Sequence, residues 1–301
     1  MNILIIGYGS IARRHEEVLF NLDSKSNIDI VTKQKLVNRT TFVSLTEVID
    51  LKMYDYFVIA SETNKHYEQL KYLEDKLINK LIFCEKPLFE KSRELKILKN
   101  SVVIGYVLRF HPMLQEVKNL LKNDKIISIN AKCGSYLPTW RQNIDYKDSY
   151  SAKKDEGGGV LLDLSHELDY IQWLSGKITE IKSYQLKVSD LEIDSDDLVV
   201  AIGKTEEDTV VNFSIDYISK IAHRLIIIDT NEKSFKLDFT DNSLIIKDKN
   251  GNEEKKIINF ERNDMFYSMH KSALSTKEQI CTFEQGLDTM SLISNIQGQN
   301  I

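Results

Sequence analysis

Residues 163–169 hold the side chains that acid and base chemistry needs. Asp163 and His166 are three residues apart, as are His166 and Asp169, and residues at this spacing are neighbours on a helix surface. A carboxylate beside an imidazole can hold its tautomer and tune its pKa, so the group is a candidate acid/base unit. The alternative is a surface histidine with helical ion-pair neighbours, and the spacing alone favours neither.

A helix over residues 160–174 would carry this unit. Its apolar stripe would consist of Leu161, Leu164, Leu168 and Ile171. The opposite side would carry Asp163, His166, Tyr170 and Trp173. Glycines at 157–159 come just before this helix, and they predict a place where substrate or cofactor approaches the backbone.

A second candidate site lies at the start of the chain, where the turn reads Gly7-Tyr8-Gly9-Ser10-Ile11-Ala12. It follows an apolar strand at residues 2–6 and opens a helix at 12–22. Gly7 permits the tight turn, Gly9 lets N–H groups approach a pyrophosphate, and Ala12 is small enough for helix–strand packing. This context favours a dinucleotide site over a glycine-rich turn without a ligand.

The end of the next strand, residues 28–32, bears on the choice of dinucleotide. An acid there binds the ribose hydroxyls of NAD, but the chain reads Thr32-Lys33-Gln34. Thr32 and Lys33 could bind a 2′-phosphate, which leans toward NADP over NAD. The alternative is that Lys33 is a solvated surface lysine.

Strands and helices alternate in the first half, which predicts a parallel sheet of α/β type. The expected strands are residues 2–6, 28–32, 56–60, 81–84 and 102–105. The expected helices are 12–22, 45–51, 65–77 and 91–99. We place the end of this dinucleotide-binding (Rossmann) domain, residues 1–112, at Pro112.

The second half predicts an α+β domain, residues 113–301, with a largely antiparallel sheet, because strands follow one another in series. The expected strands are 126–133, 178–188, 198–202, 210–215, 225–228, 235–239 and 244–246. Turns are expected at Asp241-Asn242 and Asn250-Gly251. The expected helices are 113–121, 160–174 and 283–296.

Composition excludes several classes of protein. Net charge is −5 with scattered basic residues, so no nucleic-acid partner is expected. No apolar run reaches membrane-spanning length, and no signal peptide is expected. Three distant cysteines without ligand spacing predict reduced thiols, a cytoplasmic location and no metal site.

Motifs along nearly the whole chain resemble the glucose–fructose oxidoreductase / inositol dehydrogenase (Gfo/Idh/MocA) family. The matching segments are the turn at 7–12 with Arg14-His15, the loop 60–66, Cys84-Glu85-Lys86-Pro87, Gly105-Tyr106 with 109–112, and 157–169. This resemblance implies that the cofactor also contacts Ser61, Thr63, His66, Glu85 and Lys86.

The resemblance also implies catalytic roles. Lys86 would hydrogen-bond the reacting oxygen, His166 would act as general base or acid, and Asp163 would orient it or bind a substrate hydroxyl. The common family spacing is one residue longer than the Asp163–His166 spacing here. With residues 136–152, the shorter form resembles a subgroup linked with surface-sugar synthesis, which points to a sugar or nucleotide sugar.

The expected substrate contacts are Arg109, Trp140, Arg141, Asp163 and Tyr170. Trp140 could stack on a sugar and Arg141 could bind a phosphate or carboxylate, or both could simply pack or face solvent. The main expectation is an NAD(P)-dependent sugar dehydrogenase or reductase. The alternatives are a hydrolase or epimerase with tightly bound cofactor and transient oxidation, and a non-catalytic sensor. We expect a homodimer or homotetramer.

Overall fold

The computed structural model describes residues 1–141 and 144–298. Its contacts divide the chain into two compact units. The first contains residues 1–110 and 261–287, and the second contains residues 111–260 and the chain from 288 onward. The boundary expected at Pro112 is close to the observed one. Residues 261–287, however, belong to the first unit, because this late segment packs against it.

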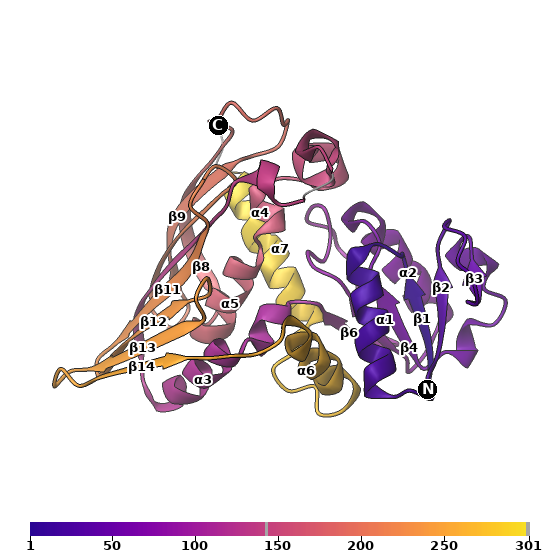
Figure 1. The fold of residues 1–301 in the computed structure, drawn as a ribbon, viewed down its shortest axis with the longest axis horizontal. Helices are drawn as coiled ribbons and strands as arrows, with labels where there is room; N and C mark the ends of the chain where they lie inside the picture. Colours follow the sequence, from indigo (N-terminus) through magenta and orange to yellow (C-terminus); the bar gives the residue numbers. More distant parts are fainter. Residues whose placement is uncertain (142–143, 299–301) are drawn as a thin grey trace. The chain divides into compact units, whose positions relative to one another are not determined.

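The first unit is built on one mostly parallel sheet (Figure 1). Its strands are β1 (Asn2–Ile6), β2 (Asn27–Val31), β3 (Thr41–Phe42), β4 (Tyr56–Ile59), β5 (Leu81–Cys84), β6 (Ser101–Ile104) and β15 (Cys281–Thr282). They lie in the order β15-β6-β5-β4-β1-β2-β3, and β15 pairs antiparallel to β6. β4 is buried at every residue, as a strand covered on both faces should be. The expected α/β fold is confirmed.

Three helices of the first unit are α1 (Ser10–Leu22), α2 (His66–Lys76) and α6 (Arg262–Leu274). Single turns of 3₁₀ helix are η3 (Thr63–Lys65) and η4 (Val107–Phe110). α6 packs on α1, and Arg14 donates a 2.6 Å hydrogen bond to Oδ1 of Asn263 between them (Figure 1). A segment from the end of the sequence thus completes the first unit.

The helix expected at residues 45–51 is wrong. Two separate single turns form there, η1 (Leu45–Glu47) and η2 (Leu51–Met53). Asp50 caps the second turn by accepting a hydrogen bond from the backbone N–H of Lys52. Because aspartate favours caps and turns over helix interiors, the helical pattern is interrupted at this point.

The helix expected at residues 91–99 is also wrong, since this stretch contains no helix. The buried carboxylate of Glu74, on α2, accepts hydrogen bonds of 2.7 Å from the backbone N–H groups of Leu98 and Lys99. These N–H groups are therefore bound to a side chain instead of to helical carbonyls. Apolar periodicity does not report such a long-range hydrogen bond.

The second unit is built on one large sheet. Its strands are β7 (Ile126–Gly134), β8 (Ile178–Leu186), β9 (Leu198–Thr205), β10 (Val210–Asp216), β11 (His223–Thr230), β12 (Lys233–Asp238), β13 (Ser243–Asp248) and β14 (Glu253–Ile257). They lie in the order β14-β13-β12-β11-β7-β10-β9-β8, with β7 and β10 parallel and the other neighbours antiparallel. The expected α+β fold is confirmed.

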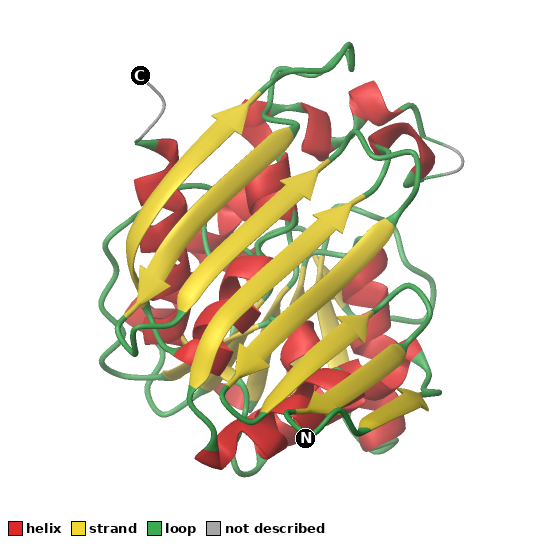
Figure 2. Ribbon diagram, turned by 90° about the vertical axis from the view of Figure 1, so that its left-hand side faces the viewer, coloured by secondary structure: helices red, strands yellow, loops and turns green. Residues whose placement is uncertain are grey.

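Helices cover one face of this sheet (Figures 1 and 2). They are α3 (Pro112–Leu120), α4 (Val160–Asp163), α5 (His166–Ser175) and the C-terminal part of α7 (Phe283–Gln297), which begins in the first unit. Single 3₁₀ turns are η5 (Leu121–Asn123), η6 (Leu137–Thr139), η7 (Tyr146–Asp148), η8 (Tyr150–Ala152) and η9 (Lys154–Glu156). These turns lie in the connections on either side of β7 and before α4.

The other face of the large sheet carries no helix in the described part of the second unit (Figure 2). Along β9, Val199 and Ala201 are buried, whereas Val200 and Ile202 are exposed, as alternation in a one-sided sheet requires. Large apolar side chains lie on this exposed face, where Tyr184 is 71% exposed and Ile202 57% exposed. Such a surface is typical of a contact with another protein.

The described residues provide neither a membrane-spanning helix nor a metal site. None of the helices within 1–141 and 144–298 is long and apolar enough to cross a membrane. Over the same residues, no group of histidine, cysteine, aspartate and glutamate could hold a metal ion. Cys84, Cys133 and Cys281 are buried free thiols.

Candidate functional site

The turn between β1 and α1 has the shape of a phosphate-binding loop. Gly7 has a φ of 94°, and a Cβ there would lie 2.6 Å from the Cα of Ser61, so only glycine fits. Gly9 has a φ of −81° and open space where its Cβ would be. The chain itself therefore does not require glycine at position 9, and the missing side chain favours the close approach of a ligand.

The start of α1 suits an anionic ligand. Gly9 is its N-cap, no side chain of the described residues caps this end, and no acidic residue lies in the first turn. The N–H groups near Ser10 and Ile11 therefore point to the open space beside Gly9, with the positive end of the helix dipole behind them. These residues fit the pyrophosphate of a dinucleotide.

Tyr8 lies beside this turn on the helix side. Its hydroxyl donates a 2.5 Å hydrogen bond to Oε2 of Glu16, and the guanidinium of Arg13 lies 5.2 Å from its ring centre. Arg39 makes a 2.9 Å ion pair with the other oxygen of Glu16. The ring is therefore held in place next to the predicted cofactor site.

The end of β2 differs from the expectation in one detail. The hydroxyl of Thr32 accepts the N–H of Gln34 at 3.1 Å, so it stabilises its own turn. Gln34, which was not predicted as a site residue, donates from Nε2 to the carbonyl of Tyr8 at 3.1 Å. Lys33 and Arg13 are exposed. The sequence contains no acidic residue from 32 to 35. This segment therefore offers no carboxylate to Lys33.

His66 is buried beside the loop at Ser61, and the cofactor contact expected for it stays a prediction. It is 1% exposed, and its ring nitrogens lie 3.1 Å from the carbonyls of Pro87 and Ser61. Burial lowers the pKa of this imidazole, so the neutral ring is favoured, and its single N–H can donate to one of these two carbonyls. Ser61 and Thr63 remain partly exposed at the edge of the first loop.

Glu85 and Lys86 follow β5 at its carboxyl end, which is the edge where doubly wound sheets bind ligands. Lys86 is half-buried. Glu85 Oε1 lies 2.9 Å from Nε2 of His15, and Oε2 accepts the N–H of Lys86 at 3.2 Å. Both carboxylate oxygens bind groups of the chain, and the cofactor contact expected for Glu85 stays a prediction.

Arg109 lies in η4 of the first unit and is 2% exposed. Its Nη1 donates a 2.7 Å hydrogen bond to Oε1 of Gln285. The guanidinium is thus bound by the late segment 261–287, which belongs to the same unit. Its expected role in substrate binding stays a prediction.

The single helix expected at residues 160–174 is wrong. Asp163 ends α4 and His166 begins α5. Between them the N–H of Ser165 bonds to the carbonyl of Leu162, three residues back, so one turn is tightened. The spacing of three residues therefore does not place Asp163 and His166 on one helix face.

Asp163 is instead oriented by two tyrosines from other segments. Tyr217, just after β10, donates a 2.6 Å hydrogen bond to its Oδ2. The pKa of Tyr150 is raised chiefly by the negative charge of Asp163, and that of Tyr217 by burial and then by the same charge. Both hydroxyls therefore stay protonated and can donate.

Trp140 and Arg141 lie on these tyrosines. The Trp140 ring meets the ring of Tyr217 edge-on at 5.1 Å, and the Arg141 guanidinium lies 5.1 Å from the ring centre of Tyr150. We call Asp163, Tyr150, Tyr217, Trp140 and Arg141 the Asp163 cluster. Three members were predicted from the sequence, and the two tyrosines that join them were missed. Tyr150 lies in a stretch that resembles the family, but Tyr217 carries no motif.

The Asp163 cluster offers chemistry that suits a sugar. Asp163 is 6% exposed and supplies a fixed carboxylate acceptor. Trp140 and Arg141 are partly exposed, so an apolar ring and a cation lie near that acceptor. Ring stacking, a carboxylate for hydroxyls and a guanidinium for an anionic group can together bind a sugar derivative. The neighbouring Asp196 is half-buried, and desolvation raises its pKa.

His166 begins a helix that is anchored to the sheet. Glu167 is fully buried and accepts two hydrogen bonds from Arg224 of β11, at 2.7 and 3.1 Å. Tyr170 is also fully buried, and burial beside Glu167 raises its pKa. Tyr170 therefore packs in the core, and its expected contact with substrate stays a prediction. His166 itself is partly exposed.

The glycines at 157–159 pack against the chain itself. A Cβ on Gly158 would lie 2.1 Å from the carbonyl oxygen of Tyr150. A Cβ on Gly159 would lie 2.2 Å from Oδ1 of Asp196. The missing side chains of Gly158 and Gly159 let other segments of the second unit pack closely against this backbone. Atoms of the chain therefore occupy the space where we expected a ligand to approach.

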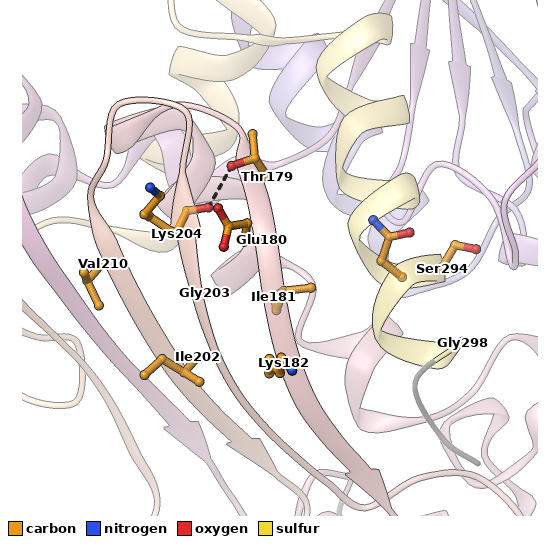
Figure 3. A pocket seen from close by; sticks show the side chains of 11 residues that line it. Thr179, Glu180, Ile181, Lys182, Ile202, Gly203, Lys204, Val210, Ser294 and Gly298 are labelled. Atoms are coloured by element: carbon orange, nitrogen blue, oxygen red, sulfur yellow. Dashed lines mark hydrogen bonds between the residues drawn. The ribbon is translucent and has the colours of Figure 1, made fainter.

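A surface groove lies elsewhere in the second unit, along the edge strand β8 and the end of α7 (Figure 3). Thr179 donates to the carbonyl of Lys204 on its rim at 3.3 Å, and Ile181 points toward α7. None of the predicted site residues lines this groove. We assign it no role in the chemistry.

Comparison with protein families gives two matches. Residues 1–103 match the model described as the oxidoreductase family with an NAD-binding Rossmann fold. Residues 114–235 match the GFO/IDH/MocA C-terminal domain. Together the two models cover most of both sequence halves.

Two bacterial proteins are similar to part of this chain. 2,7-Anhydro-N-acetylneuraminate hydratase of Escherichia coli K12 is 28% identical over 166 residues, 52% of this chain and 42% of the relative. An uncharacterized oxidoreductase of Streptococcus pneumoniae is 28% identical over 146 residues, 46% and 38% of the two chains. The match thus spans about two fifths of each relative's length.

Solved structures share the fold over the whole chain. UDP-N-acetylglucosamine 3-dehydrogenase of Acidithiobacillus ferrooxidans has a TM-score of 0.78 at 16% identity, covering 99% of this chain and 97% of its own. A levoglucosan dehydrogenase in complex with NADH and levoglucosan has a TM-score of 0.83 at 13% identity, covering 99% and 96%. At such identities the likeness establishes the fold.

Proposed function

Because this chain belongs to the Gfo/Idh/MocA family of NAD-binding oxidoreductases, we propose that it transfers hydride between a nicotinamide dinucleotide and a hydroxyl or carbonyl group of a sugar or nucleotide sugar. The observation that carries this proposal is the Asp163 cluster, which presents a carboxylate, an indole ring and a guanidinium together. The open turn at Gly9 supports the cofactor half of the proposal.

Lys86 and His166 do the proton chemistry in this proposal. The nicotinamide, when bound, supplies the hydride acceptor or donor. Lys86 donates a hydrogen bond to the reacting oxygen, and its ammonium stabilises the charge of a developing alkoxide. His166 takes the proton of the hydroxyl during oxidation and returns it during reduction.

The Asp163 cluster binds the substrate. Asp163 accepts hydrogen bonds from sugar hydroxyls, while Tyr217 keeps its carboxylate in one orientation. Trp140 stacks on an apolar face of the ring, and Arg141 binds an anionic substituent such as a diphosphate. A nucleotide sugar used for surface-polysaccharide synthesis has both features, and the names of two structural relatives point to sugar substrates.

The preferred dinucleotide is NADP. The support is the absence of an acid from 32 to 35 in the sequence and the exposed cations of Lys33 and Arg13. A 2′-phosphate carries negative charge that these side chains can neutralise, whereas NAD offers only hydroxyls. Gln34 would then position the turn, since it already binds the carbonyl of Tyr8.

The open apolar face of the large sheet supports self-association. Tyr184, Leu186, Val200 and Ile202 on β8 and β9 are exposed together. We propose that a second copy of the chain covers this face in a homodimer or homotetramer.

A second candidate function is a lyase or hydrolase reaction with tightly bound cofactor and transient oxidation. The observation that favours it is the hydratase name of one relative. The two candidates use the same residues and differ in whether the cofactor is reduced at the end of each turnover.

One experiment separates the candidates. The purified protein is mixed with NAD or NADP and a panel of sugars and UDP-sugars, and the absorbance of reduced nicotinamide is followed alongside chromatography of the sugar. Net reduction supports the dehydrogenase. Product without net reduction supports the second candidate. Binding without turnover means a sensor and overturns both.

A further inference from the structure

Four polar side chains in the first unit form a continuous hydrogen-bonded array that ends at Lys86. The hydroxyl of Tyr56 lies 2.9 Å from Nδ1 of His270, whose Nε2 lies 2.8 Å from Nδ1 of His15. His15 Nε2 lies 2.9 Å from Oε1 of Glu85. The other oxygen of Glu85 accepts the backbone N–H of Lys86 at 3.2 Å.

The array is assembled from four separate elements. Tyr56 lies on β4, His15 on α1, His270 on α6 and Glu85 just after β5. The first three side chains are fully buried, and Glu85 is 8% exposed. Polar groups cost free energy when buried unless each finds a partner. A chain of satisfied groups in this position instead specifies one arrangement of the elements that carry it.

The surroundings of the two imidazoles are aromatic. The ring of Phe83 lies 5.1 Å from the ring of His15 and 5.0 Å from that of His270, and Phe266 lies 5.6 Å from His15. In this setting a charged imidazole pair would be costly. Burial lowers the pKa of His270 far below its usual range, which supports a neutral ring.

A single direction of donation along the array is consistent with its geometry. Tyr56 donates to His270 Nδ1, His270 donates from Nε2 to His15 Nδ1, and His15 donates from Nε2 to Glu85. His270 is then neutral, in agreement with its lowered pKa, and Glu85 is the last acceptor. The pKa of Tyr56 is raised well above its usual range by burial, so its hydroxyl retains the donated proton.

We propose that Tyr56, His270 and His15 are positioning residues for Lys86. The array holds the Glu85 carboxylate in one rotamer. That carboxylate accepts the backbone N–H of Lys86 and so fixes the backbone from which the Lys86 side chain extends. Misplacement of a reacting group by a small distance is enough to slow a reaction, which gives the array a function beyond packing. This inference rests on the proposed function of Lys86.

Other titratable groups also face Glu85. The Cys84 thiol and the His66 imidazole interact with its charge, from β5 and from the start of α2. Neither is a member of the array, since the ring nitrogens of His66 face two backbone carbonyls instead. The array is therefore tested by changing His270 or Tyr56, which lie at its far end.

The test variant is His270→Phe, which suits the aromatic surroundings and breaks the array at its centre. Its matched control is Met269→Leu, a change at the neighbouring, fully buried position of α6. The first readout is the hydrogen-exchange rate of the Lys86 amide in full-length protein. We expect His270→Phe to raise it about five- to tenfold, the factor that one ordinary hydrogen bond provides. Met269→Leu should leave it unchanged.

The second readout is steady-state turnover with the sugar found in the panel. We expect His270→Phe to lower kcat about tenfold and to change the pH profile of kcat, with the KM for the dinucleotide unaltered. If His270→Phe does not fold, Tyr56→Phe removes a single hydroxyl and should give the same changes at smaller size.

The two readouts separate the possible failures. An unchanged Lys86 amide in both array variants overturns the array, whatever the activity. A response of that amide equal to the response in Met269→Leu overturns it as well. A faster amide exchange without any change in kcat shows that the array holds the backbone of Lys86 but overturns its positioning role in the reaction. The catalytic role of Lys86, and with it the proposed function, is tested separately by Lys86→Ala.

Discussion

The hydroxyl of Tyr217 donates a 2.6 Å hydrogen bond to Oδ2 of Asp163. This bond joins the residue just after β10 to the last residue of α4, which are 54 positions apart in the sequence. Tyr217 is fully buried, so its hydroxyl has little freedom to bind water instead. Asp163 is thereby held in one orientation.

Removal of that hydroxyl should weaken substrate binding. We expect Tyr217→Phe to raise the KM for the sugar about five- to tenfold, because the Asp163 carboxylate loses a charge-assisted hydrogen bond. The KM for the dinucleotide should stay unchanged. Steady-state kinetics on both substrates makes the measurement, and Tyr184→Phe, on the exposed sheet face of the same unit, is the control. Equal KM values in both variants would remove Tyr217 from the site.

Lys86→Ala and His166→Ala should each lower kcat by about 10²-fold or more, the usual contribution of acid/base groups. Binding of the dinucleotide, followed by fluorescence, should survive in His166→Ala because this residue lies in the second unit. Lys91→Ala is the control for an exposed lysine of the first unit. Near-normal turnover in either site variant would exclude that residue from the mechanism.

Lys33→Ala should lower the affinity for NADP more than the affinity for NAD. The expected loss for NADP is about tenfold, since a charge-assisted contact with the 2′-phosphate disappears and NAD has no such phosphate. Titration of each dinucleotide into the protein gives the ratio. Lys25→Ala removes an exposed lysine after α1 and should affect both cofactors equally. An equal loss for NAD and NADP in Lys33→Ala would contradict the assignment.

His111 makes stability depend on pH. It caps α3 by accepting the N–H of Met113 at 3.2 Å, and burial, followed by the charge of Arg224, lowers its pKa to about 4. An unfolded histidine titrates near pH 6.5. Between pH 6.5 and 4 the unfolded chain therefore binds a proton that the folded chain does not, and the free energy of unfolding falls as pH falls.

The size of this effect is about 3 kcal/mol over that interval for a shift of this magnitude. Denaturant unfolding of the wild type and of His111→Asn at a series of pH values measures it. Asparagine keeps a capping acceptor but cannot titrate, so the difference between the two proteins should narrow as pH falls from 7 to 4. Parallel curves would show that His111 does not titrate as described.

A charge on the open sheet face should disrupt self-association. We expect Ile202→Glu, at a position 57% exposed on β9, to convert the assembly to monomers in light scattering. Ile78→Glu places the same charge at a position 66% exposed in the first unit and should leave the assembly intact. A wild-type monomer would contradict the proposed interface at once.

Local patterns in the sequence predicted the elements that depend on their own residues. The turn at Gly7 and Gly9, the strands around it and the strand series after 178 all follow from short-range periodicity and glycine placement, and the structure contains them. Both fold classes followed from the same evidence. Asp163, Trp140 and Arg141 were identified by residue type and resemblance.

Only the tertiary structure decided which distant residues meet. Tyr217 joins Asp163 from another segment, Glu74 prevents a helix at 91–99, and His270 enters the first unit from the end of the chain. Each depends on a single hydrogen bond or packing contact between residues far apart in sequence. Such a contact produces no periodic pattern in the local sequence, because its free energy depends on where the rest of the chain has folded.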